Sequence, residues 1–305
     1  MEEVKKASKL VTVFTPTYNR AKNLQRLYDS LCRQTNQNFE WIVVDDGSTD
    51  NTEVCVKSYL NHNNNFYIRY VKTENKGKHC AINLGVSLAM GEYFFIVDSD
   101  DYLSENAIER IYYWFASISC EASYAGICGN KFDLVSGLVG TTFDSSYIDV
   151  RMHERKKYNI TGDKAEVFYT NVLKQYPFPC FEGETFLSEG VVWNRISADG
   201  YLMRYFNENI YCCQYLSEGL SNNLFKLRKK NIKGTLLFFK ELYFLQKDLW
   251  DKLKTGSFYV RFAKYNKFSF CEIREELHEN PFMVMALYLF YVGRLFLEWK
   301  RKGKM

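Results

Sequence analysis

The sequence predicts an α/β fold in which a mainly parallel sheet is flanked by helices and followed by a helical C-terminal extension. Three observations support this prediction. Short apolar segments alternate with helical segments through residues 10–100. These apolar segments lack polar alternation, which is typical of strands buried on both faces of a parallel sheet. From residue 216 onward the composition shifts to helical segments rich in Lys, Leu and Phe.

The N-terminal elements alternate regularly. The first strand covers residues 10–14 and ends before Pro16, because proline cannot donate to a strand ladder. A helix with an apolar face follows over residues 21–33. The sequence then predicts, in order, a strand at 41–44, a helix at 52–60, a strand at 68–71, a helix at 78–89 and a strand at 93–97.

The second half is less regular. The segments 125–132 and 137–142 are predicted to be strands, and 176–179 a rigid aromatic loop. Further helices are predicted at 191–198, 236–253, 272–278 and 282–299.

Composition narrows the class of protein. The net charge of +4 is too small to indicate a nucleic-acid partner. The nine cysteines form no CxxC pair, so we expect free thiols in a reducing cytoplasm. The first ten residues carry no apolar signal-peptide core, and no run of about 18 apolar residues predicts a membrane span.

Polar clusters follow three of the predicted strands. They are Pro16-Thr17-Tyr18-Asn19, Asp45-Asp46 and Asp98-Ser99-Asp100-Asp101. Ligands of such sheets bind at the carboxyl ends of the strands, so we expect the three clusters to form one site. Tyr18 could there flank a nucleotide base, and Thr17 its edge.

The acidic cluster after residue 97 predicts a metal site. Carboxylates so close together repel each other unless a cation compensates them, and Mg²⁺ or Mn²⁺ would do so with oxygen ligands. The alternative is a solvated turn that caps a helix, since Asp101 and Ser104 are both good capping residues. Asp-Gly at 46–47 likewise has a plain alternative as a turn.

Three motifs in this order and spacing resemble those of the family 2 glycosyltransferases, enzymes of the GT-A fold that use nucleotide-diphospho-sugars. The motifs are VTVFTPTYNR at 11–20, WIVVDDGSTD at 41–50, and GEY at 91–93 leading into DSDD at 98–101. The resemblance covers residues 9–115 and implies roles for individual residues. Pro16, Tyr18 and Asp46 would contact the base, Asp98 (beside Ser99) would lie near the ribose, and Asp100 with Asp101 would bind the metal on the diphosphate.

One position departs from the family pattern. Family members often carry Arg where this chain has Ile82. Lys78, beside His79, is therefore predicted to face the donor phosphates, because lysine binds phosphate as a point charge. The alternative is a solvated surface lysine.

The acceptor side is predicted from the segment FLSEGVVW at 186–193, which resembles the family's stretch around the catalytic base. Glu189 is the predicted base, with Glu182 and Glu184 as competitors. A charge at a helix start is the alternative for Glu189. Trp193 is either core or an acceptor platform. Asp163 and Lys164 resemble donor-sugar contacts, with an Asp that opens a helix as the alternative.

The resemblance implies an inverting hexosyltransferase that uses a UDP-sugar and a saccharide or lipid-linked acceptor in cell-surface polysaccharide synthesis. Residues 1–215 would form the catalytic unit, with a nucleotide-binding half at about 1–115 and an acceptor half at 116–215, and residues 216–305 the extension. The alternatives are a nucleotidyltransferase, whose Gly-rich loop is missing after the first strand, and a non-catalytic binding protein. The helix at 282–299 and the basic residues after it could contact the inner face of a membrane or simply pack. Dimerisation stays open.

Overall fold

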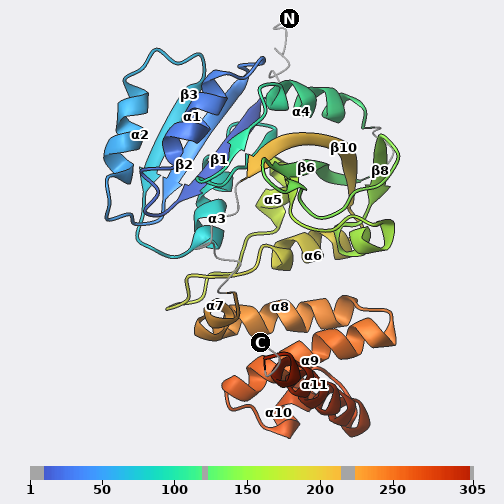
Figure 1. Cartoon of the computed structure of the whole chain (residues 1–305). Helices are drawn as coiled ribbons and strands as arrows, with labels where there is room; N and C mark the ends of the chain where they lie inside the picture. Colours follow the sequence, from blue (N-terminus) through green and yellow to red (C-terminus); the bar gives the residue numbers. More distant parts are fainter. Residues whose placement is uncertain (1–9, 119–122, 214–223, 303–305) are drawn as a thin grey trace, which may run out of the picture.

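The computed structural model describes residues 10–118, 123–213 and 224–302, and within them ten strands form one mixed sheet (Figure 1). The strands are β1 (Val11–Thr17), β2 (Phe39–Asp45), β3 (Tyr67–Lys72), β4 (Tyr93–Ile96), β5 (Tyr102–Leu103), β6 (Tyr124–Asp133), β7 (Gly137–Leu138), β8 (Tyr147–Val150), β9 (Lys164–Tyr169) and β10 (Leu202–Cys213). Their order is β3-β2-β1-β4-β9-β6-β10-β5, with β7 on β6 and β8 on β10. The first four are parallel, and β9 runs antiparallel between β4 and β6. The predicted α/β class is confirmed.

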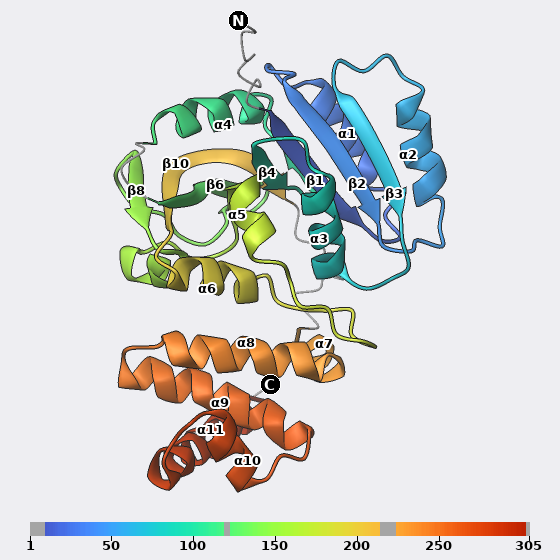
Figure 2. The same ribbon diagram turned by 180° about the vertical axis from the view of Figure 1, so that it is seen from behind.

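Helices cover both faces of the sheet (Figures 1 and 2). Leu27 of α1, Val56 of α2 and Ile111 of α4 belong to the apolar cluster on one face. Val86 of α3 and Val192 of α6 belong to the cluster on the other face. The helices of this region are α1 (Leu24–Cys32), α2 (Thr52–Leu60), α3 (Lys78–Leu88), α4 (Ala107–Ala116), the 3₁₀-helix η1 (Met152–Tyr158), α5 (Thr170–Gln175) and α6 (Gly190–Ala198).

The C-terminal helices have an apolar core of their own. They are α7 (Leu224–Lys230), α8 (Ile232–Leu245), α9 (Leu249–Tyr265), α10 (Phe270–Glu276) and α11 (Pro281–Lys302). Tyr243, Phe262 and Leu287 lie in this third cluster. Phe238 of α8 packs against both this cluster and the one beneath α6, so α8 joins the extension to the sheet region (Figure 1).

Two predicted boundaries are wrong. β1 continues through Pro16 to Thr17 because β4 pairs with β1 only over Val11–Phe14, so the missing N–H of Pro16 breaks no bond on that side. The single helix predicted at 236–253 is two helices, α8 and α9. Asp248 starts the second helix, because its side chain accepts bonds from the backbone N–H groups of Trp250 and Asp251.

Some predictions lie outside the described residues, namely the boundary between 215 and 216, the first nine residues and Cys120. Within the described residues, no single helix is long and apolar enough to cross a membrane, although α10 and α11 up to Leu297 pass that test together with a bend of 109° between them.

Candidate active site

The parallel strands bring the predicted polar clusters to one edge of the sheet. β1 and β2 stay in register as far as Thr17 and Asp45. The backbone N–H of Asp46 then donates to the Thr17 carbonyl at 2.9 Å. β4 pairs with the other side of β1 and ends at Ile96, so Asp98 follows at the same edge. The convergence of the three strand ends is therefore confirmed.

Asp46 fixes the loop that leads into α3. Its two carboxylate oxygens accept hydrogen bonds from the backbone N–H groups of Lys76 and Gly77, both at 2.8 Å. Burial raises the pKa of Asp46, although these two bonds act in the opposite direction. Gly77 has a φ of +91°, and a Cβ there would lie 2.1 Å from the Thr185 carbonyl oxygen, so only glycine fits. The next residue, Lys78, is positioned as a result.

Lys78 joins the predicted nucleotide side of the site to the predicted acceptor side. Its Nζ lies 2.6 Å from Oδ1 of Asp98 and 2.9 Å from Oε1 of Glu189. Lys78 begins α3, Asp98 follows β4, and Glu189 is the N-cap residue of α6. An ammonium has three N–H donors, so two of them are used here and one is left for a further acceptor.

The pairing of Lys78 with Asp98 favours the charged forms of both groups. Burial opposes the charge on Lys78, but Asp98 and Glu189 raise its pKa above the ordinary value. Burial would likewise raise the pKa of Asp98, yet Lys78 and Lys131 lower it. Lys131 of β6 lies with its Nζ 4.2 Å from the centre of the Tyr211 ring. This edge of the sheet therefore carries two ammonium groups beside Asp98, which suit an anionic ligand.

Tyr211 of β10 holds the acidic turn in place. Its hydroxyl donates to Oδ2 of Asp101 at 2.8 Å and accepts from the backbone N–H of Asp98 at 2.9 Å. Asp101 is nearly buried, and burial together with the nearby Asp98 raises its pKa to about 6. Arg26 donates to the carbonyl of Asp100.

Asp100 is the carboxylate best placed for a metal. Its side chain is 29% exposed and lies 3.5 Å from Nη2 of Arg20, whereas Asp98 is paired with Lys78 and Asp101 with Tyr211. Mg²⁺ and Mn²⁺ prefer oxygen ligands and commonly take one or two carboxylates together with substrate phosphates. The donor chemistry of this turn fits such an ion.

Tyr211→Phe tests whether the turn depends on this hydroxyl. We expect the free energy of unfolding to fall by about 1–3 kcal/mol, because the buried Asp101 carboxylate and the Asp98 N–H both lose a partner. Urea unfolding followed by circular dichroism measures the change. An unchanged midpoint would show that the hydroxyl is not needed. Tyr113→Phe, at an exposed ring of α4, is the matched control.

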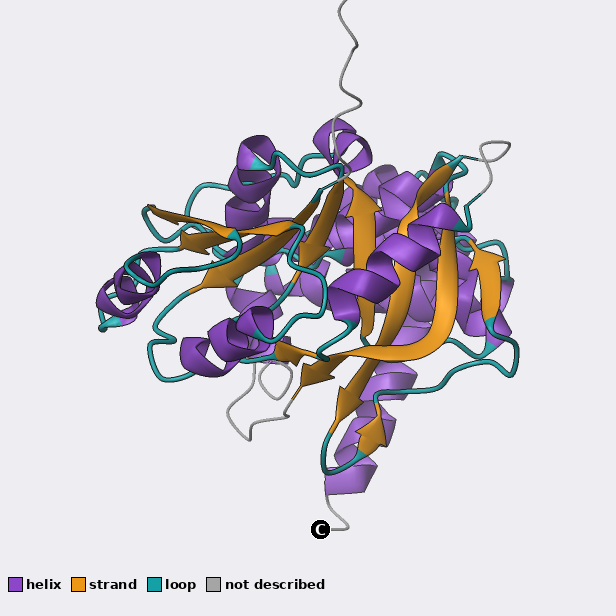
Figure 3. Cartoon of the chain, turned by 90° about the horizontal axis from the view of Figure 1, so that it is seen from above, coloured by secondary structure: helices purple, strands orange, loops and turns teal. Residues whose placement is uncertain are grey.

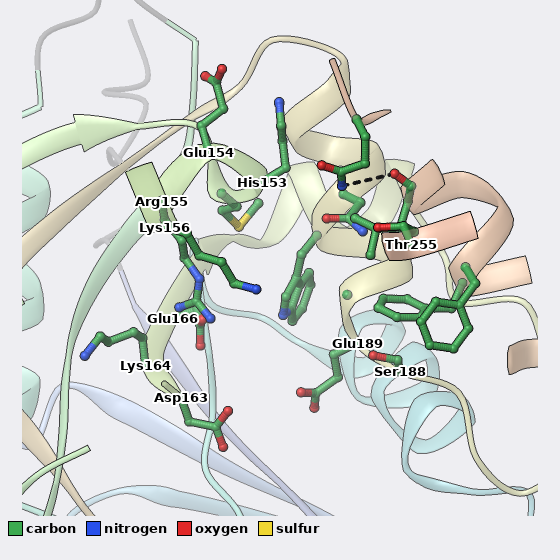
Figure 4. A pocket seen from close by; sticks show the side chains of 18 of the residues that line it. His153, Glu154, Arg155, Lys156, Asp163, Lys164, Glu166, Ser188, Glu189 and Thr255 are labelled. Carbon is green, nitrogen blue, oxygen red and sulfur yellow. Dashed lines mark hydrogen bonds between the residues drawn. The ribbon is translucent and has the colours of Figure 1, made fainter. Parts of the chain in front are cut away.

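A pocket of about 570 Å³ opens beside the ion pairs of Lys78 (Figure 4). Lys78, Asp98 and Glu189 line one side of it. The rest of its wall comes from η1, β6, β9, α6, α8 and α9, and includes Lys131, His153, Glu154, Arg155, Asp163, Glu166, Ser188, Trp193, Phe238 and Phe258. The pocket therefore lies between the sheet region and the C-terminal helices.

The three residues predicted to contact the donor sugar or the acceptor differ in how they lie relative to the pocket. Asp163 lines the pocket and precedes β9, so it opens a strand and not a helix. Lys164 is almost fully buried and its Nζ donates to the Val139 carbonyl at 3.1 Å, away from the pocket centre (Figure 4). Trp193 lines the pocket and also stacks on Phe168 with ring centres 4.3 Å apart. Trp193 is thus part core and part wall.

At the end of β1 lie three of the residues predicted to bind the nucleotide: Pro16, Thr17 and Tyr18. Pro16 and Thr17 are buried, whereas the Tyr18 ring is 47% exposed. Ser99 is nearly buried in the acidic turn. An exposed aromatic ring beside a strand end leaves a flat apolar surface for a base.

The two competitors of Glu189 lie outside the pocket wall. Glu184 accepts bonds from the backbone N–H groups of Lys233 and Gly234 at the start of α8, at 2.7 and 2.9 Å. Glu182 is exposed. Among the three predicted candidates, Glu189 alone faces Lys78 and the pocket.

The prediction that all thiols are free is wrong for one pair. Cys80 of α3 and Cys180 form a disulfide, and six further described cysteines are free. The side chain of Asn83 also exchanges two hydrogen bonds with the backbone of Phe178, both at 2.8 Å. The fold brings together residues that are 100 positions apart, which no local spacing shows. Both contacts anchor the segment that leads to Glu189.

Four residues of the site are not predicted from the sequence: Lys131, Arg155, Glu166 and Tyr211. Each lies in a strand or 3₁₀-helix of the second half and is surrounded by unremarkable neighbours. The basic run HERKKY at 153–158 is the one local signal that could have drawn attention to Arg155.

Comparison with known proteins gives consistent matches. The model of the family described as "Glycosyl transferase family 2" matches residues 12–167. Glycosyltransferase GlyG of Streptococcus pneumoniae is 46% identical over 107 residues, which are 34% of this chain and 35% of GlyG. Chondroitin synthase of Pasteurella multocida is 44% identical over 101 residues, 33% of this chain and 10% of that protein. The matched region is therefore a minor part of each relative.

Solved structures share the fold over most of the chain. S. aureus TarS 1–349 in complex with UDP-GlcNAc aligns with a TM-score of 0.62 at 17% identity, over 96% of this chain and 92% of that one. The mannosyltransferase PcManGT from Pyrobaculum calidifontis, in complex with GDP-Man and Mn²⁺, aligns with a TM-score of 0.54 at 17% identity, over 92% and 86%. At these identities the likeness concerns the fold alone.

Proposed function

The chain belongs to glycosyl transferase family 2, and from that premise we propose that it transfers a hexosyl group from a UDP-sugar to a hydroxyl of a saccharide or lipid-linked acceptor, with inversion at the anomeric carbon. The observation that carries this proposal is the bridge formed by Lys78 between Asp98 and Glu189 in the wall of the pocket. Through this bridge, the Lys78 ammonium contacts both Asp98, on the proposed donor side, and Glu189, the proposed base.

Donor binding uses the edge of the sheet. The base would stack beside Tyr18, the ribose would lie near Asp98, and the remaining N–H of Lys78 would donate to a diphosphate oxygen. Asp100 would hold a Mg²⁺ or Mn²⁺ ion on the diphosphate, where such an ion neutralises the charge of the leaving group.

Glu189 would act as the general base. Its carboxylate takes the proton of the acceptor hydroxyl as the oxygen of that hydroxyl forms a bond to the anomeric carbon. The bond from that carbon to the phosphate oxygen breaks, and the electron pair leaves with the nucleoside diphosphate. Attack from the face opposite the phosphate inverts the configuration. The ion pair with Lys78 holds the Glu189 carboxylate at the pocket.

Arg155 and Glu166, which line the same pocket, form the proposed sugar subsite. Nη2 of Arg155 donates to the Gly162 carbonyl at 2.9 Å, whereas Nη1 is buried and has no hydrogen-bond partner among the described residues. Glu166 lines the same pocket, and burial raises its pKa from 4.5 to about 7. A donor and an acceptor left available in this way suit the hydroxyl groups of a sugar.

Glu166→Gln should weaken binding of the nucleotide-sugar and leave binding of UDP unchanged, because UDP lacks the sugar. Calorimetric titration with both ligands measures the difference, and an equal loss for the two would remove Glu166 from the subsite.

The Glu166→Gln variant should also be more stable than wild type at high pH. Folded Glu166 stays protonated up to a higher pH than unfolded Glu166, so wild-type stability falls as pH rises from 4.5 to about 7. We expect a higher Tm for the variant at about pH 8 and no difference at about pH 4.

A further inference from the structure

The last helix exposes an uninterrupted apolar face. Val284 and Leu287 point into the core of the C-terminal helices. The opposite face of α11 carries side chains with large exposed fractions, which we call the apolar stripe: Phe282 (88%), Met285 (53%), Leu289 (68%), Val292 (56%) and Phe296 (58%). Their spacing places all five on one side of the helix.

The apolar stripe is too long to be ordinary surface. It extends over fifteen helical positions, which correspond to about 21 Å along the axis. It contains no charged residue. Contiguous apolar surfaces of this kind on soluble proteins usually mark a contact with a protein or a membrane.

The end of the helix favours a lipid surface over a partner helix. Leu295, Phe296 and Leu297 follow one another and are all exposed, at 36%, 58% and 57%. Successive helical residues point about 100° apart, so these three side chains face different directions. A partner helix covers one side of α11, whereas lipid can contact a helix that lies in the bilayer surface on several sides. Figure 3 shows the helix that leads to the C label extending beyond the sheet region.

Aromatic and basic residues accompany the apolar stripe. The Trp250 ring contacts Phe290 of α11 edge-on with ring centres 5.0 Å apart and is itself 64% exposed. Tryptophan is enriched where a protein meets the boundary between lipid chains and water. α11 continues through Lys300 to Lys302, and Lys300 is exposed. Basic residues at the end of an apolar face match anionic lipid head groups.

We propose that α11 docks on an anionic lipid bilayer, with the apolar stripe among the upper acyl chains and the exposed Lys300 near its end against the head groups. This interaction goes beyond glycosyl transfer and does not depend on the nucleotide site, because α11 supplies no residue to the pocket wall.

Co-sedimentation of the full chain with vesicles tests the proposal. One set of vesicles contains phosphatidylcholine and phosphatidylglycerol, and the other phosphatidylcholine alone. We expect stronger binding to the anionic vesicles, and at least about tenfold weaker binding for Leu289→Gln/Phe296→Gln, since each change removes a large apolar side chain from the lipid. The matched control is Leu134→Gln/Val135→Gln, which alters two residues that are 71% and 90% exposed in the turn after β6. The control should bind like wild type.

Three outcomes would overturn the proposal. They are no binding of wild type to the anionic vesicles, undiminished binding of the stripe variant, and a dimer in size-exclusion chromatography that the stripe variant dissociates while neither form binds vesicles. The third outcome would assign the stripe to a second copy of the chain. Titration of the same samples with UDP separates this test from the proposed function, because nucleotide binding should be equal in wild type and both variants.

Discussion

Glu189→Gln should lower the rate of sugar transfer by about 100- to 10,000-fold, the usual contribution of a general base. The amide cannot accept the proton of the acceptor hydroxyl, but its oxygen can still accept a bond from Lys78, so the fold and the nucleotide site should remain intact. The rate is measured as UDP release from the best donor of a panel of UDP-sugars, in the presence of a saccharide acceptor.

Glu182→Gln is the matched control, because Glu182 is an exposed carboxylate on the same segment. It should transfer at the wild-type rate. If Glu189→Gln kept its turnover, the base assignment would be wrong, while the assignment of the enzyme class would stand on the family match.

Asp100→Asn should abolish the effect of metal on donor binding and lower transfer by at least about 100-fold, since metal stabilisation of a leaving group is worth several kcal/mol. The neutral amide is a poorer ligand for a hard cation, and it also weakens the contact with Arg20 by removing the negative charge. Transfer is measured over a range of Mn²⁺ concentrations, with EDTA as the metal-free reference.

Glu105→Gln provides the control for this variant, because Glu105 is a nearby exposed acid paired with Arg33 at 3.6 Å. Its metal dependence should equal that of wild type. A normal response to Mn²⁺ in Asp100→Asn would show that other residues hold the metal or that transfer does not require one.

The nucleotide side of the fold could be predicted because its information is local. Parallel strands buried on both faces give unbroken apolar segments, and the polar residues at 16–19, 45–46 and 98–101 follow directly after them. The helix predicted at 52–60 coincides with α2. Where apolar segments and polar clusters follow each other this closely in the sequence, the structure adds little to the prediction beyond the order of the strands.

The acceptor side depends on contacts between distant segments. β10, the longest strand, was missed because its polar residues interrupt the apolar pattern, and with it Tyr211, whose hydroxyl reaches residues more than a hundred positions away. The pairing of Cys80 with Cys180 and the meeting of Lys78 with Glu189 have the same origin. The roles assigned to the site residues stay predictions until variants are measured.

Calorimetric titration of the full chain with UDP, GDP and dTDP, each with Mn²⁺ and with EDTA, tests the central claim most directly. We predict that UDP binds, that Mn²⁺ strengthens its binding, and that GDP and dTDP bind more weakly. Absence of binding for all three nucleotides under both conditions would contradict it, and the acidic turn would then be a structural feature held by Lys78, Arg20 and Tyr211.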